Sequence, residues 1–337
     1  MVRRVLIMVA VVLLVSGVAW GWLWWNAKPS PKGEAYVGMT NVPLWDGNGQ
    51  VRRRLQNLSW GDKLTILDQY NDSIEVRTAQ GKVGWVNQDR LIDAAVWQRL
   101  GSLAERVRQM TTQAPAHTAV LSNLRLDPGR TSPRVGQLKP NTPVDVLERG
   151  VATRSEASAV ARDTSRKEDW LLVRARTGDG TQIAGWVLAS FIDLDLPDPL
   201  PAYATSAGMS PIAFFPLRTV QDPSDGPKPY YLVAGSSGVQ GQPCDFTMLR
   251  VYTWSTVKHR YETSFVRNDL CGHLPIRVER DADPQHDAQF SFDNFSASGS
   301  QPLTYRMRST IVRPVRSPSP SRNARNANPS RAGTARR

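Results

Sequence analysis

The C-terminal third of the sequence contains the one cluster of side chains whose types could carry out chemistry: Cys244, Cys271, His259 and His273. A thiolate beside a histidine base would form a cysteine nucleophile, but Cys244 precedes a strand-like run instead of opening a helix. The four side chains could also bind zinc, although the 26 residues between the cysteines hold no Cys-x-x-Cys pair. In an oxidising compartment the two cysteines would pair as a disulfide. The disulfide is the simplest of these three alternatives.

No other catalytic or cofactor motif stands out in the 337 residues. The sequence shows no glycine-rich phosphate loop, Ser-His-Asp arrangement, His-Glu-x-x-His helix or paired-carboxylate motif. Its four histidines leave few groups for acid–base work. We therefore expect a protein that is not an enzyme, and we assign no catalytic residue, no metal ligand and no cofactor.

The N-terminal residues 1–27 are predicted to be a transmembrane anchor or a signal peptide. Val5 to Trp25 are 21 uncharged positions preceded by Arg3 and Arg4, and this length crosses a hydrocarbon core of about 30 Å. The alternative to a retained anchor is cleavage after Ala19. An anchor would make a single-pass inner-membrane protein with a cytoplasmic N-terminus and a periplasmic bulk, whereas cleavage would make a secreted one.

The net charge of +12 is concentrated at the two ends of the chain. Seven arginines and no acid lie between Arg313 and Arg337, and four basic residues face one acid between Met1 and Glu34. The nearly neutral body argues against a nucleic-acid-binding fold, which would gather its basic residues on one structured face. Residues 316–337 have few apolar side chains and are predicted to be a disordered tail. This basic tail could attach to an anionic polymer or to lipid head groups.

The body of the sequence contains an internal repeat of two copies. LSWGDKLTILD from Leu58 aligns with LKPNTPVDVLE from Leu138, and each copy continues to a Gly-Trp-Val run, at Gly84 and at Gly185. Apolar and polar residues alternate with period two between glycine-containing turns, which predicts short antiparallel strands. About five such strands in some sixty residues form a small closed barrel, so the repeat predicts two barrels in tandem.

The second copy resembles the bacterial SH3 (SH3b) domain family. The resemblance lies in SNLRLDPGRTSPRVGQLKPNTPVDVLE, which begins at Ser122, in DWLLVRA and in AGWVLASFI. It covers residues 118–194 well and residues 36–93 more loosely, because Pro43 replaces the arginine of the family's opening motif and Trp45 enters a loop that is usually small and polar. The resemblance implies two exported binding modules, often used to hold proteins against peptidoglycan or its peptides and sometimes against other proteins.

A binding role of this kind needs exposed aromatic rings and hydrogen-bonding groups in a groove between loops. The candidates are Trp45, Trp60, Tyr70, Trp170 and Trp186. Trp45 and Trp60 lie in turn-like sequence, where packing explains a large ring less readily. For Trp186 and its counterpart Trp85, packing inside the barrel is the favoured interpretation, because both belong to Gly-Trp-Val strands.

We divide the body at a predicted linker helix over residues 94–113, for which Asp93 is the N-cap. Its apolar residues follow a helical spacing of four and three: Val96, Leu100, Leu103, Val107 and Met110. The stripe indicates a connecting helix that lies on a barrel, with a dimer seam as the alternative. The first SH3b-like domain then spans 35–93 and the second spans 117–195, with a polar loop insertion at 149–169.

Residues 198–315 form six strand-like runs and predict a β-sandwich or barrel of no family that we recognise. The fold class is therefore mainly β. The expected function is non-catalytic binding of peptidoglycan or of an envelope protein, with no nucleic acid partner. The alternatives are a cell-envelope enzyme with its chemistry in residues 198–315, such as a wall peptide hydrolase, and a structural scaffold for other envelope proteins.

Overall fold

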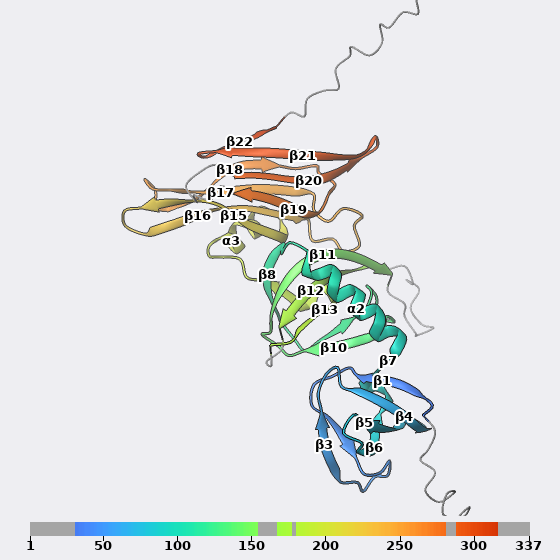
Figure 1. Cartoon of the computed structure of the whole chain (residues 1–337). Helices are drawn as coiled ribbons and strands as arrows, with labels where there is room; N and C mark the ends of the chain where they lie inside the picture. Colours follow the sequence, from blue (N-terminus) through green and yellow to red (C-terminus); the bar gives the residue numbers. More distant parts are fainter. Residues whose placement is uncertain (1–30, 154–166, 177–179, 281–287, 316–337) are drawn as a thin grey trace, which may run out of the picture. The chain divides into compact units, whose positions relative to one another are not determined.

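The computed structural model describes residues 31–153, 167–176, 180–280 and 288–315. It confirms a mainly β protein, built from four antiparallel sheets (Figure 1). The chain divides into two compact units: the first contains residues up to Leu103 together with Pro133–Gln137, and the second contains Ala104–Ser132 and the residues from Leu138 onward. Among the described residues no helix is long and apolar enough to cross a membrane, and the predicted anchor at 1–27 and tail at 316–337 lie outside these residues.

The first sheet has the strand order β3-β2-β6-β5-β4-β1-β7. Its strands are β1 (Gly33–Val37), β2 (Val42–Trp45), β3 (Arg54–Leu58), β4 (Lys63–Tyr70), β5 (Ser73–Thr78), β6 (Val83–Asn87) and β7 (Leu91–Asp93), with a 3-10 turn η1 (Gln88–Arg90) before β7. Burial alternates along β5, as the period-two pattern predicts. The glycine of Gly-Trp-Val is needed because a Cβ at Gly84 would lie 2.5 Å from the Trp45 carbonyl oxygen.

The second sheet repeats this strand order as β10-β9-β13-β12-β11-β8-β14. Its strands are β8 (Ala114–Thr118), β9 (Ser122–Arg125), β10 (Arg134–Leu138), β11 (Pro143–Thr153), β12 (Lys167–Arg176), β13 (Gln182–Leu188) and β14 (Ile192–Leu194), with η2 (Ala189–Phe191) before β14. β11 and β12 stay paired out to Thr153 and Lys167. The flanks of the segment predicted as loop 149–169 are therefore strands, and residues 154–166 lie outside the described residues.

Helix α2 (Ala94–Arg108) follows the first sheet and begins where the sequence predicts. The Asp93 carboxylate accepts a hydrogen bond from the backbone N–H of Val96 at 2.8 Å, which confirms the N-cap. Leu100, Leu103 and Val107, at the centre of the predicted stripe, are buried within the chain.

The helix ends at Arg108, earlier than residue 113, because its last carbonyl groups are bound by a side chain. Arg174 on β12 donates to the carbonyl oxygens of Val107 and Met110, at 2.9 and 3.4 Å. The same guanidinium pairs with Asp145 on β11 at 2.9 Å. The arginine donates hydrogen bonds to carbonyl oxygens that would otherwise accept them from the N–H groups of a further helical turn.

The C-terminal region contains a short helix and two four-stranded antiparallel sheets, with orders β15-β16-β17-β18 and β19-β20-β21-β22. The elements are α3 (Leu200–Ser206), β15 (Ser210–Asp222), β16 (Gly226–Ser236), β17 (Met248–Ser255), β18 (Arg260–Arg267), β19 (Gly272–Arg280), β20 (Ala288–Ser296), β21 (Gly299–Arg308) and β22 (Ile311–Pro314). One hydrophobic core takes side chains from both sheets, including Leu232 and Phe290. The two sheets form the two layers of a sandwich (Figure 1).

The two cysteines of the chain form the predicted disulfide, Cys244–Cys271. It joins the loop after β16 to the residue before β19. Phe246 and Gly272 are paired as an isolated β-bridge beside the disulfide, and the Phe246 ring occupies the space that a Cβ of residue 272 would need. The zinc and nucleophile alternatives would each require thiols that the disulfide uses.

A buried arginine connects the second barrel to this disulfide loop. The Arg149 side chain on β11 is 4% exposed and contacts Asp169 at 2.6 Å and Asp245 at 3.2 Å. It also donates to the backbone carbonyl oxygens of Gln242 and Cys244, at 3.1 and 3.2 Å. Two carboxylates and two carbonyls thus compensate one buried cation, as burial of a charge requires.

Replacing Arg149 with Ala should lower the free energy of unfolding by about 3–5 kcal/mol, because the buried Asp245 and the half-buried Asp169 would lose their cation. Urea denaturation followed by circular dichroism would measure this loss. The control is Arg106→Ala, which removes an exposed pair with Glu148 and should cost less than about 1 kcal/mol. Equal losses in the two variants would mean that the buried pairs contribute no more than a surface pair.

Candidate functional site

The first barrel presents two tryptophans side by side on one face. Trp45 on β2 and Trp85 on β6 are direct cross-strand partners, so their side chains project from the same face of the sheet. Both rings are half-buried. The guanidinium carbon of Arg52 lies 4.5 Å from the centre of the Trp45 ring, within the range of a cation–π contact. We call Trp45 and Trp85 the indole pair.

A carboxylate follows the indole pair across the sheet, because Glu75 on β5 is the cross-strand partner of Trp85. The surface therefore carries a cation at Trp45, two indole rings and an acid beside Trp85. The repeat signalled Gly84-Trp85, but sequence analysis missed Glu75, whose cross-strand neighbour depends on register, and Arg52, which the loop between β2 and β3 brings to Trp45. The pair is not duplicated: the corresponding partner of Trp186 in the second barrel is Arg125.

Trp60 lies in a different aromatic cluster of the first unit. Its ring centre is 5.2 Å from that of Trp97 on α2, and the Trp97 ring stacks on Tyr36 at 4.5 Å. The Trp60 indole N–H donates to the carbonyl of Val135 at 2.9 Å, within the same compact unit. These contacts give Trp60 a packing role at the start of the helix.

Tyr70 lies apart from both aromatic groups. It ends β4 at a tight turn where Asn71 has a φ of 50°, and its side chain is 62% exposed. No ring contact brings it near another candidate among the described residues. Tyr70 is therefore exposed enough to touch a ligand, but no neighbouring group on the structure shapes a site around it.

Trp170 and Trp186 in the second barrel are only 3% and 6% exposed. The Trp186 ring packs against Gly150, where a Cβ would lie 2.8 Å from the ring, and Pro128 packs against the same glycine. Gly150 on β11, the counterpart of Tyr70 on β4, thus covers Trp186. Neither ring offers an exposed face to a ligand, which favours packing for both residues.

The second barrel instead has a charged surface groove of about 490 Å³ that sequence analysis missed. Its lining combines prolines with both signs of charge: Pro115, Ala116, Pro143, Val144, Asp145, Arg174, Ala175, Arg176, Gln182 and Asp195. The Nδ1 atom of His117 lies 2.6 Å from the Asp195 carboxylate, and Arg174 pairs with Asp145. Most of the charges are therefore already paired.

In the sandwich, Asp222, Asp225 and His259 place metal-ligand atoms within 4.8 Å of one another. However, Asp222 already accepts the Trp254 indole N–H at 2.7 Å and the backbone N–H groups of Ser224 and Asp225. The hydrogen bond from Trp254 is the main cause that lowers the pKa of Asp222 to about 2. The cluster therefore connects the β15–β16 turn to the β17–β18 hairpin, a structural task that needs no ion.

Comparisons with known proteins give only distant matches. Neither a family model nor a curated protein matches the sequence. Among solved structures, an NlpC/P60 family protein from Bacillus cereus matches at 13% identity with a TM-score of 0.22, over 52% of this chain and 62% of that chain. NlpC2 and NlpC1 from Trichomonas vaginalis each match 72% of this chain at a TM-score of 0.18, with 11% and 12% identity over 99% and 95% of their own lengths. Superpositions this poor carry no argument about activity.

The pH dependence of stability tests the Asp222 hydrogen bonds. The folded pKa of about 2 lies below the unfolded value of about 3.9, so this stabilisation is complete above pH ~4 and is lost as the pH falls towards 2. Asp222→Asn should therefore reduce stability at neutral pH and flatten its dependence between pH ~4 and ~2. Urea titrations at several pH values would measure both effects. Asp225→Asn, which keeps the Trp254 hydrogen bond, is the control, and an identical change there would contradict the assignment.

Proposed function

We propose that the protein is a non-catalytic binding protein of the bacterial cell envelope, which holds peptidoglycan or an envelope peptide or protein through its tandem SH3b-like modules. The observation that carries this proposal is the indole pair with Arg52 stacked on one ring and Glu75 beside the other. Within the tandem, the first module supplies the aromatic binding surface, because in the second module Trp186 is buried and its cross-strand partner is Arg125 instead of a second tryptophan.

The chemistry of this surface suits a ligand with flat apolar faces and charged ends. Indole rings stack on apolar faces of sugars and side chains, and Arg52 and Glu75 lie at opposite ends of the row to receive a carboxylate and an amine. A glycan cross-linked by short peptides has all of these groups. No group on this surface resembles a nucleophile with a base, so binding without turnover is the function we propose.

The proposed location follows from the sequence. Retention of residues 5–25 as a single-pass anchor would place the modules outside the inner membrane, and cleavage would release them as a secreted protein. The oxidising conditions of that compartment suit the disulfide Cys244–Cys271. The enzyme alternative would have to use groups other than these two cysteines, and no described group favours it.

Sedimentation with purified sacculi tests the proposal on the full chain. Trp45→Ala should weaken binding by about tenfold or more, because it removes one ring and the surface on which Arg52 stacks. Val257→Ala changes an exposed apolar residue in the turn between β17 and β18, outside the first sheet, and should leave binding unchanged. Thermal unfolding of both variants checks that the barrel is intact.

Repeating the assay at two salt concentrations separates stacking from the attraction of the basic tail, because only the latter weakens strongly with salt. Binding that persists in high salt and is lost in Trp45→Ala supports the indole pair. If the wild-type chain does not sediment with sacculi at either salt concentration, the peptidoglycan proposal is wrong and the scaffold alternative gains.

A further inference from the structure

The outer face of the second sandwich sheet carries a row of four polar residues in register. Glu279 on β19, Gln289 on β20, Arg306 on β21 and Arg313 on β22 are successive cross-strand partners. Gln289 donates to the Glu279 carboxylate and accepts from Arg306, both at 3.2 Å. The row is therefore negatively charged at its β19 end, where the acid lies, and positively charged at its β21–β22 end, where the two arginines lie.

The arginine end of this row is not neutralised by its neighbours. Arg306 and Arg313 lie directly opposite each other, a like-charge pair that destabilises a sheet. Within the described residues Arg313 has no ion pair, and Glu279 is separated from Arg306 by a full strand, roughly 10 Å away. From Gly299 to Arg337 the sequence has nine arginines and no acid.

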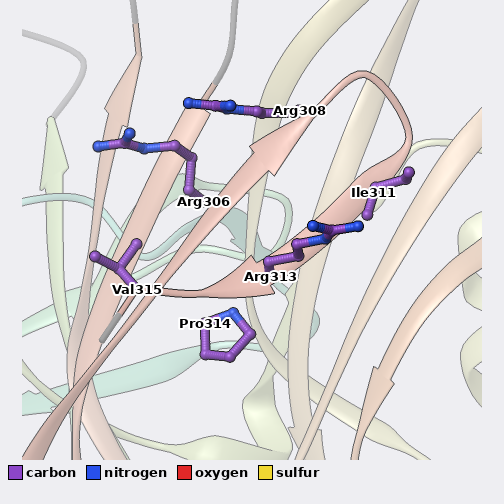
Figure 2. Close-up of a pocket in the computed structure, with 6 residues that line it drawn as sticks. All are labelled: Arg306, Arg308, Ile311, Arg313, Pro314 and Val315. Carbon is purple, nitrogen blue, oxygen red and sulfur yellow. The ribbon is translucent and has the colours of Figure 1, made fainter. Parts of the chain in front are cut away.

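A surface hollow of about 390 Å³ lies on the same hairpin. Three arginines and three apolar residues line it: Arg306, Arg308, Ile311, Arg313, Pro314 and Val315 (Figure 2). In Figure 2 the side chains of Arg306 and Arg308 extend to the same side, whereas Arg313 extends along β22 towards Ile311. Ile311 is 55% exposed and Val315 is 39% exposed, although Val312 between them is buried in the core.

We propose that the β21–β22 hairpin binds the phosphate groups of an anionic phospholipid surface. The planar guanidinium groups of Arg306 and Arg313 can each bind phosphate oxygens with paired hydrogen bonds, and phosphates on a lipid surface would offset the repulsion between the two cations. The exposed Ile311 and Val315 side chains would enter the boundary between head groups and acyl chains. A soluble phosphate would leave these apolar side chains in water, which is why a lipid surface is the favoured occupant.

The test places a reporter on the hairpin itself. Because both native cysteines form the disulfide, Thr310→Cys in the exposed β21–β22 turn gives one site for an environment-sensitive dye. The labelled full chain is mixed with vesicles of phosphatidylcholine alone or with added phosphatidylglycerol. We expect a blue shift of the dye with phosphatidylglycerol only, whichever way the N-terminal segment associates with the vesicles.

Arg306→Gln together with Arg313→Gln should raise the lipid concentration for half-maximal shift by about 30-fold, since each arginine contributes about a factor of five. The matched control is Arg260→Gln with Arg267→Gln, two exposed arginines on β18. It removes the same charge elsewhere and should change the midpoint by less than about threefold.

Four outcomes would overturn the proposal. The first is no shift with phosphatidylglycerol, and the second is an equal loss in the β18 control, which would show attraction to net charge alone. The third is an equal shift with inorganic phosphate in the absence of vesicles, which would identify a phosphate site without a membrane role. Replacing Arg316, Arg322 and Arg325 with Gln tests the tail: if this change alone abolishes the shift, the hairpin is not the binding element.

Discussion

The buried guanidinium of Arg149 is the interaction on which the organisation of the second unit depends. A cation 4% exposed to solvent is tolerated only where acceptors replace its water, and here Asp169 comes from the barrel and Asp245 from the sandwich. The second oxygen of Asp245 accepts the backbone N–H of Leu274 at 2.9 Å, which continues the network into β19. Because each partner lies on a different element, the network is complete only when barrel and sandwich have both folded.

The same strand, β11, also distinguishes the exposed rings of the two copies. Arg149 and Gly150 take the positions of Gln69 and Tyr70 in the first copy, and Gly150 lies against the Trp186 ring. In the first copy Tyr70 stands at the position of Gly150, and the Gly-Trp-Val indole stays half-exposed beside Trp45. A duplicated module has therefore become a structural connector in one copy and has kept an open aromatic face in the other.

The parts of the fold set by local patterns could be predicted from the sequence: the alternating strands, the Asp93 cap and the disulfide. What could not be predicted depends on pairing between distant residues. Arg149 lies in a polar stretch, and polar stretches indicate solvent unless their partners are known; here the partners are 20 and 96 residues away. Arg52 was missed for a different reason: it lies in the loop between β2 and β3, and the path of that loop back over Trp45 has no sequence pattern.

Five arginines of the second unit illustrate two kinds of environment. Arg130 and Arg174 each bind one carboxylate through more than one hydrogen bond, and Arg149 binds two carboxylates. Their charges therefore stabilise the fold. Arg306 and Arg313 face each other across two strands, and Arg306 contacts only a neutral amide among the described residues. A sequence under selection for stability alone would place a threonine or an acid at one of these positions. The repulsion that remains is therefore explained most directly by an anion from outside the chain.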